Sequence, residues 1–538
     1  MTSLPRQGTD RERSVCAPPG PGGKLPYHQF DISAVRACDL HGDCGAPEPR
    51  GIAYSTRFGI RDSRALVYVL NAERRCEVSS AAQNCGLPQP ANAAVLQTLR
   101  GEFTAGRPLE PLVLRAAAGA CIEVTLRNHL PAELDDGPPP GEADGRPREV
   151  PEYRAYHNFL PMITDGFNVN QFRMSSTVGL SAARVAQNTL LADGSNVGQN
   201  DAVLRAGPGQ ATSGQGSLLP PCPPGEPRCG TDARFGGLRR IIWSATDFEG
   251  GNLPAEFGAV PLRSFGDPIK QPMHGLGGAL VIGPEGSAVC PGNRFAPRQG
   301  SRRFPGGVSA EICLRGGGRY VDHVLVVQDA VNATRGGMPV ENLSGAEEPD
   351  DYGVKALNYR TEPLWARRGN DPGIPFENRN EQDFAGVLGS GSLPGGLCAA
   401  GIPPSARAPT PCDPETPIFT ARAGEQVRLH LVHPGGHTRQ QGIAVSGHAW
   451  NPFPWSAAAQ SRVLDPAAPG GIRQGVLNGF GPMAGTTLAF RAGGEAGLAM
   501  DYLIRSQASF LFDGGLWGLL RVEPATARAP RSRPRPQR

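Results

Sequence analysis

The 538-residue chain has little net charge and no long hydrophobic run. Its 53 basic and 50 acidic residues leave a formal net charge of +3, so its composition gives no case for nucleic acid as a partner. No apolar stretch approaches the length that a transmembrane helix needs. These absences leave a globular protein, long enough to bury two or three cores of ordinary size.

Long amphipathic helices are also hard to find. The 72 glycines and 54 prolines interrupt the chain at short intervals, and both residues disfavour the interior of a helix. Between these interruptions lie short runs such as Ile122 to Leu126, sequence IEVTL, in which apolar and polar residues alternate. A period of two is typical of a half-buried strand. The chain is therefore predicted to be all-β.

Common catalytic motifs are missing as well. The sequence contains no G-x-S-x-G elbow, no H-E-x-x-H helix signature and no G-x-x-x-x-G-K-[ST] loop. Each of these motifs places a nucleophile, a zinc ion or a phosphate in a defined backbone setting. The sequence therefore gives no support to a hydrolase, a zinc peptidase or a nucleotide-binding enzyme.

No C-x-x-C motif accompanies the twelve cysteines, which favours disulfides over zinc or scattered free thiols. Five pairs are close in sequence: Cys38/Cys44, Cys76/Cys85, Cys222/Cys229, Cys290/Cys313 and Cys398/Cys412. Disulfides imply an oxidising compartment, yet the first 23 residues lack the apolar segment of a secretory signal. We expect a periplasmic or extracellular protein whose signal peptide is not visible in this chain. The alternative is a cytoplasmic protein with reduced cysteines.

Two phrases occur twice in the chain. Residues 275–284 and 515–524 share the frame G-L-x-G-x-L-x-[IV]-x-P, and residues 118–126 and 423–431 share A-G-x-x-[IV]-x-[VL]-x-L. Repeated phrases in the same order indicate that one architectural unit occurs twice. Because both phrases have the pattern of strands, the units are predicted to be two β-sandwiches.

The repeats and the loop-rich segments predict the domain organisation. Residues 1–24 are predicted to be a disordered lead-in and residues 526–538 a disordered Pro/Arg-rich tail. The first β domain is predicted at 25–290, with long loop insertions, and the second at 291–525. The two repeated phrases lie further apart in the first domain, which indicates that this domain carries the larger loop insertions.

The repeated phrases resemble the cupredoxin domain of multicopper oxidases. Residues 427–450 and 500–522 are similar to the last two motif regions of those enzymes, and residues 162–202 resemble a bacterial copper-oxidase branch. The resemblance spans about residues 60–524 and implies two cupredoxin-like Greek-key sandwich or barrel domains. It also implies a blue-copper site that takes electrons from a substrate and a trinuclear cluster that reduces dioxygen. Such sites need a thiolate and several imidazoles.

The positions at which the resemblance implies copper ligands carry other residues. In the second domain they are Gln441, Ala444, Ser446, Arg505, Ser506, Gln507 and Leu511, with Leu516 at the axial position. In the first domain the W-x-H-x-H position reads Trp243-Ser244-Ala245-Thr246-Asp247. The sequence therefore predicts the fold of a multicopper oxidase without its usual copper sites.

Three histidines remain as candidate metal ligands. His433 and His437 flank the turn Pro434-Gly435-Gly436, and His448 ends the next predicted strand. Three imidazoles suit copper or zinc, so His433, His437 and His448 are the predicted metal ligands and copper is the candidate cofactor. The alternative is that the turn histidines make local hydrogen bonds and His448 packs beside Trp450, since no carboxylate or cysteine lies nearby in sequence.

Two further expectations concern the same region. His430 shares a strand face with Arg428, opposite the apolar residues of that strand, and is expected to be solvated. Trp450, Phe453 and Trp455 form an aromatic group that either closes the end of a sandwich or lines a groove for a ligand.

The sequence leaves two functions from different classes. The first is a cupredoxin-fold binding or assembly component of the cell envelope, degenerate at the usual copper sites and acting with a protein partner or as an oligomer. The second is a copper-dependent oxidoreductase that oxidises a phenol or a metal ion with dioxygen. It would use His433, His437 and His448 or a copper site that a partner chain completes.

Overall fold

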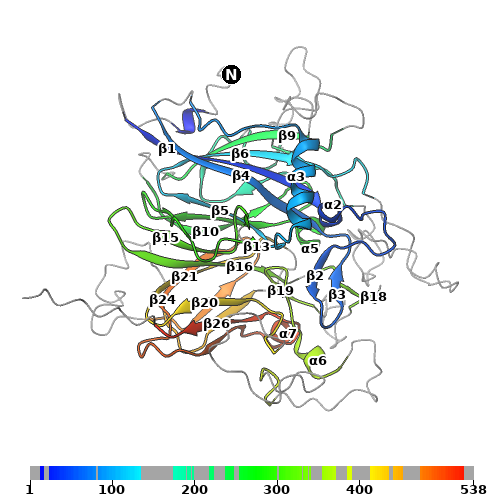
Figure 1. Cartoon of the computed structure of the whole chain (residues 1–538), viewed down its shortest axis with the longest axis vertical. Helices are drawn as coiled ribbons and strands as arrows, with labels where there is room; N and C mark the ends of the chain where they lie inside the picture. Colours follow the sequence, from blue (N-terminus) through cyan, green and yellow to red (C-terminus); the bar gives the residue numbers. More distant parts are fainter. Residues whose placement is uncertain are drawn as a thin grey trace, which may run out of the picture.

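The computed structural model shows a molecule dominated by strands, arranged in four layers along its long axis (Figure 1). It describes residues 13–16, 23–79, 83–134, 174–189, 191–195, 197–198, 217–222, 237–246, 254–299, 302–329, 331–336, 338–340, 354–370, 385–389, 412–435, 440–451 and 473–525. The predicted tail 526–538 and most of the predicted lead-in 1–24 lie outside these residues.

The first sandwich consists of an outer and an inner sheet around one core. The outer sheet has the order β4 (Leu66–Val78), β1 (Leu25–Arg36), β6 (Cys121–Asn128), β9 (Leu238–Ser244), β8 (Ala186–Gln187). The inner sheet has the order β5 (Leu112–Ala117), β11 (Gly278–Gly283), β10 (Gly258–Arg263), β7 (Ser181–Ala182). Bulky side chains such as Phe30 and Trp243 fill the space between them.

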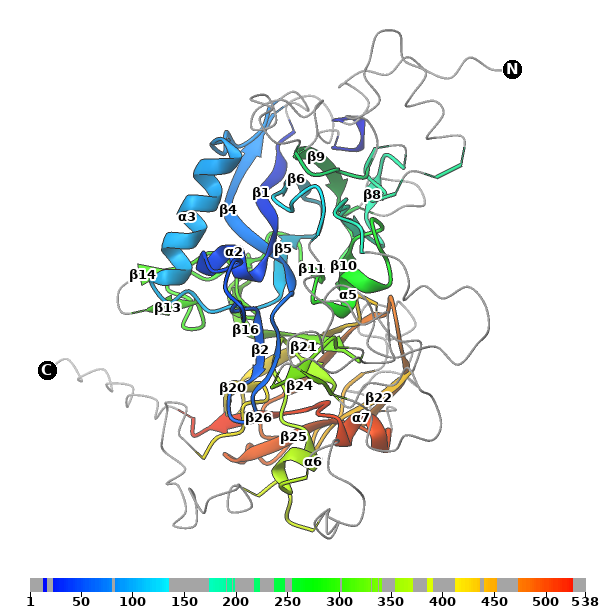
Figure 2. The ribbon, with the colours of Figure 1, turned by 90° about the vertical axis from the view of Figure 1, so that its right-hand side faces the viewer.

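The second sandwich repeats this arrangement in the C-terminal half. Its inner sheet has the order β12 (Ala288–Val289), β15 (Ser309–Cys313), β16 (Arg319–Gln328), β21 (Gln426–Val432), β24 (Gly485–Arg491), with β19 (Ala356–Leu357) also paired to β16. Its outer sheet has the order β20 (Ile418–Arg422), β26 (Trp517–Glu523), β25 (Asp501–Ser506), β22 (Gln441–Val445), β23 (Val476–Phe480). The two cores stack vertically in Figure 2.

Equivalent strands pair in the same way in both sandwiches. β1 runs parallel to β6 as β16 does to β21, and β5 runs parallel to β11 as β20 does to β26. The repeated A-G phrases form the turns that join β5 to β6 and β20 to β21, where Gly119 and Gly424 have φ of 80° and 81°. Only glycine adopts this left-handed conformation without strain. The predicted all-β fold of two cupredoxin-like Greek-key sandwiches is confirmed.

The division at residue 290 stays a prediction, because segments cross it in both directions. β12, which precedes it, pairs with β15 of the second sandwich. A small sheet with the order β18 (Met338–Pro339), β17 (Thr334–Arg335), β3 (Ile60–Asp62), β2 (Ile52–Ser55) combines strands from both halves. The hairpin of β13 (Arg298–Gln299) and β14 (Arg302–Arg303) lies between the halves in sequence.

The helices are short and lie at the edges of the sheets. They are η1 (Arg13–Cys16), α2 (Ala37–His41), α3 (Asn92–Thr104), α5 (Lys270–Met273), α6 (Leu364–Arg367) and α7 (Ser509–Asp513). The longest, α3, was not expected from the sequence; it buries Val95, Leu99 and Phe103, spaced by four, against a flanking core beside β4 (Figure 2). No helix among the described residues has the length and apolarity required to cross a membrane.

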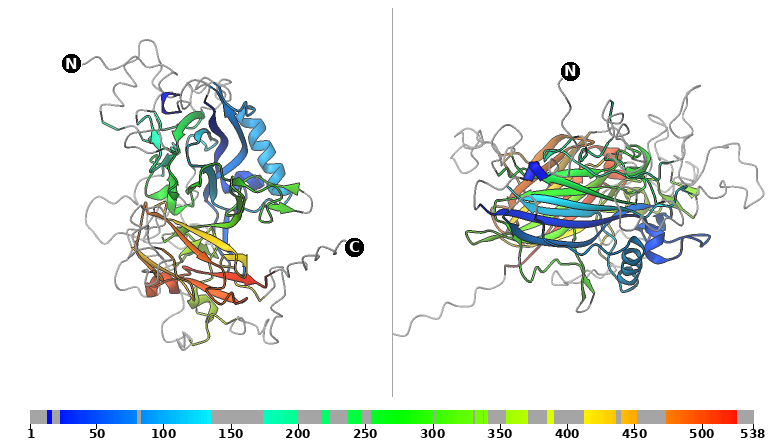
Figure 3. Two further views of the ribbon diagram at one scale, coloured as in Figure 1. Left: turned by 90° about the vertical axis from the view of Figure 1, so that its left-hand side faces the viewer. Right: turned by 90° about the horizontal axis from the view of Figure 1, so that it is seen from above.

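The inner sheets of the two sandwiches pack against each other. Val113 and Val281 of the first sandwich share a small core with Val324 and Val432 of the second, and Figure 3 shows the layers from two further directions. Two ion pairs flank this core, Arg115 with Asp322 and Arg428 with Glu256. The sandwiches are therefore joined by a mixed apolar and ionic contact.

This contact overturns the prediction that His430 is solvated. His430 is 1% exposed; its Nδ1 lies 2.7 Å from Thr487 Oγ1 and its Nε2 3.4 Å from Asp322 Oδ2. The prediction was wrong because the strand face that carries His430 is covered by the first sandwich. Burial alone would raise the pKa of Asp322, but the guanidinium of Arg115 outweighs burial and the pKa lies well below its usual range.

The half-buried pattern predicted for residues 122–126 is also wrong. All eight residues of β6 are buried, including Glu123 at 4% and Thr125 at 5% exposure. Glu123 accepts hydrogen bonds from Tyr27, Gln29 and Arg240 on the neighbouring strands. Side-chain pairing within the sheet thus hides the polar face of β6 that alternation alone assigns to solvent.

Three of the five sequence-close cysteine pairs are confirmed as disulfides: Cys38–Cys44, Cys76–Cys85 and Cys290–Cys313. Cys229 and Cys398, and with them two predicted pairs, lie outside the described residues. A fourth disulfide, Cys16–Cys121, spans 105 residues and ties η1 to β6. Its long separation gave no signal in the sequence.

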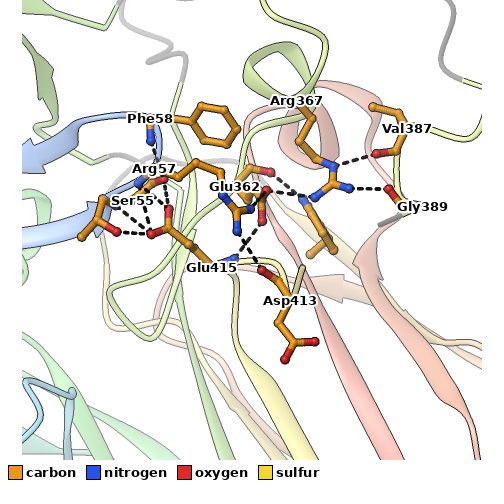
Figure 4. A network of polar contacts seen from close by, with 11 residues as sticks. Ser55, Arg57, Phe58, Glu362, Arg367, Val387, Gly389, Asp413 and Glu415 are labelled. Carbon is orange, nitrogen blue, oxygen red and sulfur yellow. Dashed lines mark hydrogen bonds and ion pairs between the residues drawn. The ribbon is translucent and has the colours of Figure 1, made fainter. Parts of the chain in front are cut away.

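A buried ionic network joins the turn after β2 to the second sandwich (Figure 4). The carboxylate of Glu362, whose side chain is 0% exposed, lies 2.6 Å from Arg57 Nη1 and 2.9 Å from Arg367 Nη1. Glu415 accepts hydrogen bonds from the backbone N–H groups of Thr56 and Arg57, and its own backbone N–H donates to Glu362. One buried carboxylate therefore compensates two guanidinium groups from different parts of the chain.

We expect Glu362→Gln to lower the free energy of unfolding by about 3–5 kcal/mol, because it leaves two partly or fully buried guanidinium groups without a counter-charge. The matched control is Glu48→Gln, which breaks the exposed pair with Arg61 and should cost no more than about 1 kcal/mol. Urea unfolding followed by circular dichroism measures both. Equal effects of the two substitutions would contradict the assigned role of Glu362.

Buried histidines should make the fold sensitive to mild acid. Burial lowers the pKa of His28 and His129 from 6.5 to about 4, and that of His323 to about 3. Each binds a proton more readily in the unfolded chain, so stability is full above pH 6.5 and falls as the pH drops toward 4. Melting temperatures between pH 7.5 and 4 should show this loss. His323→Gln should flatten the slope, and an unchanged slope would show that His323 does not contribute.

Candidate functional site

The four positions implied for a blue-copper site come together in the second sandwich. Gln441 begins β22, Ser506 ends β25, Leu511 lies in α7 and Leu516 directly precedes β26. Ser506 Oγ lies 3.3 Å from Gln441 Oε1, the backbone N–H of Ser506 donates to the carbonyl of Leu516 and that of Leu516 to the carbonyl of Leu511. None of the four is more than 1% exposed.

The donor set at these positions does not fit copper. A hydroxyl and a neutral amide stand where soft thiolate and imidazole ligands are needed. Leu511 and Leu516 belong to the hydrophobic core of the second sandwich and offer no ligand atom. The place that the resemblance assigns to the metal is therefore part of the packed interior.

A chain of buried polar contacts extends from this point to His433. Ser506 Oγ donates to Gln441 Oε1, and Gln441 Nε2 lies 3.5 Å from Asp329 Oδ2. His433 Nε2 lies 3.1 Å from the same carboxylate oxygen. His433, Asp329 and Ser506 are 0% exposed. Asp329 accepts a hydrogen bond from Gln441 and places its negative charge beside the imidazole of His433. Such pairing reduces the desolvation cost of buried polar groups.

Sequence reasoning missed Asp329. It directly follows β16, far from His433 in sequence, and the parallel pairing of β16 with β21 brings the ends of both strands together. The chain therefore does place a carboxylate beside His433, although none lies nearby in sequence. The available signal was the acidic residue after the apolar run of residues 320–328.

His448 lies in a different environment. Its Nδ1 is 2.8 Å from the carbonyl oxygen of Ser446, and its Nε2 accepts a hydrogen bond from the backbone N–H of Gly493 at 3.1 Å. Its ring packs 4.8 Å from that of Phe490 and 4.6 Å from that of Tyr502. Burial lowers the pKa of His448. Both ring nitrogens are occupied, and the contact with Gly493 would have to break before Nε2 could bind a metal.

The structure does not bring His433 and His448 together. The backbone N–H of His433 donates to Ala484, just before β24, and His448 contacts Gly493, just after that strand. At about 3.3 Å per residue these ends are roughly 20–30 Å apart. His437 lies outside the described residues. Among the described residues no three His, Cys, Asp or Glu side chains form a metal-binding group, and metal binding by the histidines stays a prediction.

The remaining implied ligand positions have structural contacts. Gln507 donates its backbone N–H to Gly442, the guanidinium of Arg505 lies 5.3 Å from the ring centre of Phe512, and Ser446 is exposed. In the first sandwich Trp243 is fully buried, while Asp247 lies outside the described residues. Neither sandwich uses these positions to build a cluster of imidazoles within the described part of the chain.

Comparisons with known proteins find similarity only among solved structures. No family model matches the sequence, and no curated protein matches it. The chain is similar to the solved structure of copper nitrite reductase from Nitrosomonas europaea, at 10% identity over 92% of this chain and 94% of that chain, with a TM-score of 0.36. It is also similar to a multicopper oxidase, at 9% identity over 92% and 89% of the two chains, again with a TM-score of 0.36.

A third similar structure is the copper-containing nitrite reductase of Thermus scotoductus, at 10% identity over 92% of this chain and 61% of that chain, with a TM-score of 0.33. Because these TM-scores lie below 0.5, the assignment of a doubled cupredoxin-like fold rests on the strand order and the repeated phrases. The fold thus places the chain among doubled cupredoxin-like proteins, whereas any metal binding has to be judged from the chain's own residues.

A cysteine introduced at the thiolate position should be inaccessible. We expect the thiol of Ser506→Cys to react with a thiol reagent only after denaturation, because residue 506 is 0% exposed. The matched control is Ser446→Cys in the turn directly after β22, where the residue is exposed and the thiol should react at once. The protein has no free cysteine to interfere among the described residues. Equal reaction rates would show that the position is open to solvent.

Proposed function

We propose that this chain is a binding or assembly component of the cell envelope, built on a doubled cupredoxin-like scaffold whose blue-copper position has become part of the core. The observation that carries the proposal is the polar chain from Ser506 through Gln441 and Asp329 to His433, beside Leu511 and Leu516. Ser506, Gln441 and Asp329 are hydrogen-bonded to one another, and Asp329 lies 3.1 Å from His433, where a redox site would have to bind a metal.

The chemistry of the four positions supports a non-redox role. Electron transfer through a blue-copper centre depends on a cysteine thiolate held with two imidazoles. Ser506 offers a hydroxyl that is already engaged by Gln441 and by the backbone N–H of Ala508. A metal at this point would displace those bonds and meet two leucine side chains. The scaffold is therefore proposed to act through its surfaces.

The disulfides support a location outside the cytoplasm. Among the described residues four disulfides close loops at the ends of the sheets, one of them spanning 105 residues. Such bonds persist in an oxidising compartment such as the periplasm or the extracellular space. We therefore propose that the protein is a secreted scaffold that binds a ligand or a partner protein.

One observation favours the second candidate, a copper-dependent oxidoreductase with an unusual site. Both ring nitrogens of His433 are buried and have no hydrogen-bond partner among the described residues, although Nε2 lies 3.1 Å from the Asp329 carboxylate. An imidazole nitrogen of this kind is a good ligand for copper. In this alternative His433 would act with His437, His448 or a residue of a partner chain, and would oxidise a phenol or a metal ion.

Copper analysis separates the two functions. Protein produced with added copper should contain well below one copper ion per chain, show no blue absorption and consume no oxygen with a phenol or ferrous iron. Stoichiometric copper with turnover would overturn the proposal. His433→Ala should then lower the copper content if that residue is a ligand.

A rebuilt site provides the positive control. The variant Gln441→His, Ser506→Cys, Leu511→His, Leu516→Met supplies two imidazoles, a thiolate and a thioether at positions that converge in the fold. We expect this variant to bind Cu(II) with an intense blue absorption. If it stays colourless while it remains folded, the four positions do not reproduce the geometry that the resemblance implies.

A further inference from the structure

A cavity of about 910 Å³ opens on the second sandwich, at the end of β22 opposite to Gln441. We call it the β22–β24 groove. It lies between Val445 with the turn that follows β22 and the last residues of β24, Ala489 to Arg491. Its volume is in the range of sites that hold small organic molecules. The groove is separate from the polar chain around Ser506.

Apolar side chains form the floor of the β22–β24 groove. Trp450, Phe490 and Val445 line it and are 2%, 5% and 1% exposed. These three side chains belong to the core of the second sandwich, so the groove has a rigid base. Trp450 therefore both closes the end of the sandwich and lines a groove, the two alternatives that the sequence left open. Phe453 and Trp455 lie outside the described residues.

The indole of Trp450 carries a hydrogen-bond donor that the described residues leave without an acceptor. Trp243 Nε1 donates to the carbonyl of Ala192 and Trp517 Nε1 to that of Glu362. No such contact is found for Trp450, although the residue is 2% exposed. A ligand in the groove that accepts a hydrogen bond from this N–H would supply the partner that an indole normally has.

The charges at the rim favour an anion. Arg491, at the end of β24, is exposed and has no ion-pair partner among the described residues. Arg473 pairs at 3.4 Å with Glu495, the one acidic residue among the described groove residues. His448 is held between ring neighbours, with both nitrogens occupied and its pKa lowered by burial. The net charge of these side chains at neutral pH is therefore positive.

We propose that the β22–β24 groove binds a small organic anion with an apolar body, of the class of aromatic carboxylates. The apolar body packs on Trp450 and Phe490. The carboxylate accepts hydrogen bonds from the guanidinium of Arg491 and from the Trp450 N–H. This inference rests on the proposed binding role and adds the ligand class and the residues. Anion binding in the groove needs no copper. The groove proposal can therefore fail while copper analysis still supports the proposed non-redox function.

The test is isothermal titration of the full chain in buffer with a chelator, using 2-naphthoate and its neutral analogue 2-naphthalenemethanol. We expect saturable binding of one 2-naphthoate per chain and at least tenfold weaker binding of the alcohol. Arg491→Gln should weaken 2-naphthoate binding about tenfold or more, because it removes a charge-assisted contact. Arg319→Gln, which changes an exposed arginine at the start of β16, is the matched control and should leave binding unchanged.

A second variant separates the indole donor from the apolar floor. Trp450→Phe keeps an aromatic ring but removes the N–H, and should weaken 2-naphthoate binding without abolishing it. Equal binding of the acid and the alcohol, an unchanged affinity in Arg491→Gln, or no binding at all would each overturn the proposal. A copper-containing, oxygen-consuming protein that still binds 2-naphthoate would instead overturn the proposed non-redox function and leave the groove in place.

Discussion

The buried carboxylate of Asp329 is the interaction on which the centre of the second sandwich depends. It accepts a hydrogen bond from Gln441 and lies 3.1 Å from His433 Nε2, and Gln441 in turn accepts a hydrogen bond from Ser506. A buried amide without such a partner would cost about 1–3 kcal/mol. The hydrogen bonds among Ser506, Gln441 and Asp329 therefore let the fold keep polar residues in the interior of the second sandwich.

The contact between the sandwiches is a second constraint of the same kind. Because the inner sheets face each other, polar residues on both are buried and must pair: Arg115 with Asp322, and His430 with Thr487. Valine side chains around them supply the apolar part of the contact. Each inner sheet, which would have one solvent-exposed face in an isolated sandwich, is thus covered on both faces. The ion pair of Arg115 with Asp322 links the two sandwiches.

Binding and redox chemistry place different demands on such a scaffold. A redox site needs ligands at fixed positions in the interior, and those positions carry Ser506, Gln441 and two leucines. A binding site needs an open cavity with a rigid base, and the β22–β24 groove has one in Trp450 and Phe490. These four positions are packed in the interior, while the groove at the other end of β22 presents the Trp450 indole and Arg491, which has no ion-pair partner among the described residues.

Local patterns in the sequence were enough to predict the all-β class, the doubled unit and three disulfides. Each depends on neighbours along the chain: glycine turns such as that at Gly119, strand periodicity, and cysteines a few residues apart. The implied ligand positions Gln441 and Ser506 lie on the paired strands β22 and β25 and contact each other. His437 lies outside the described residues, so its part in the metal site stays a prediction.

Only the tertiary structure decided what lies beside each of these residues. Asp329 reaches His433 through the parallel pairing of β16 with β21, Cys16 reaches Cys121 across 105 residues, and His430 is buried by the other sandwich. His433 and His448 are close in sequence but contact residues at opposite ends of β24, Ala484 and Gly493. The physical reason is that strand patterns specify which face a side chain takes, whereas its partners come from strands and sheets that pack against it from distant parts of the chain.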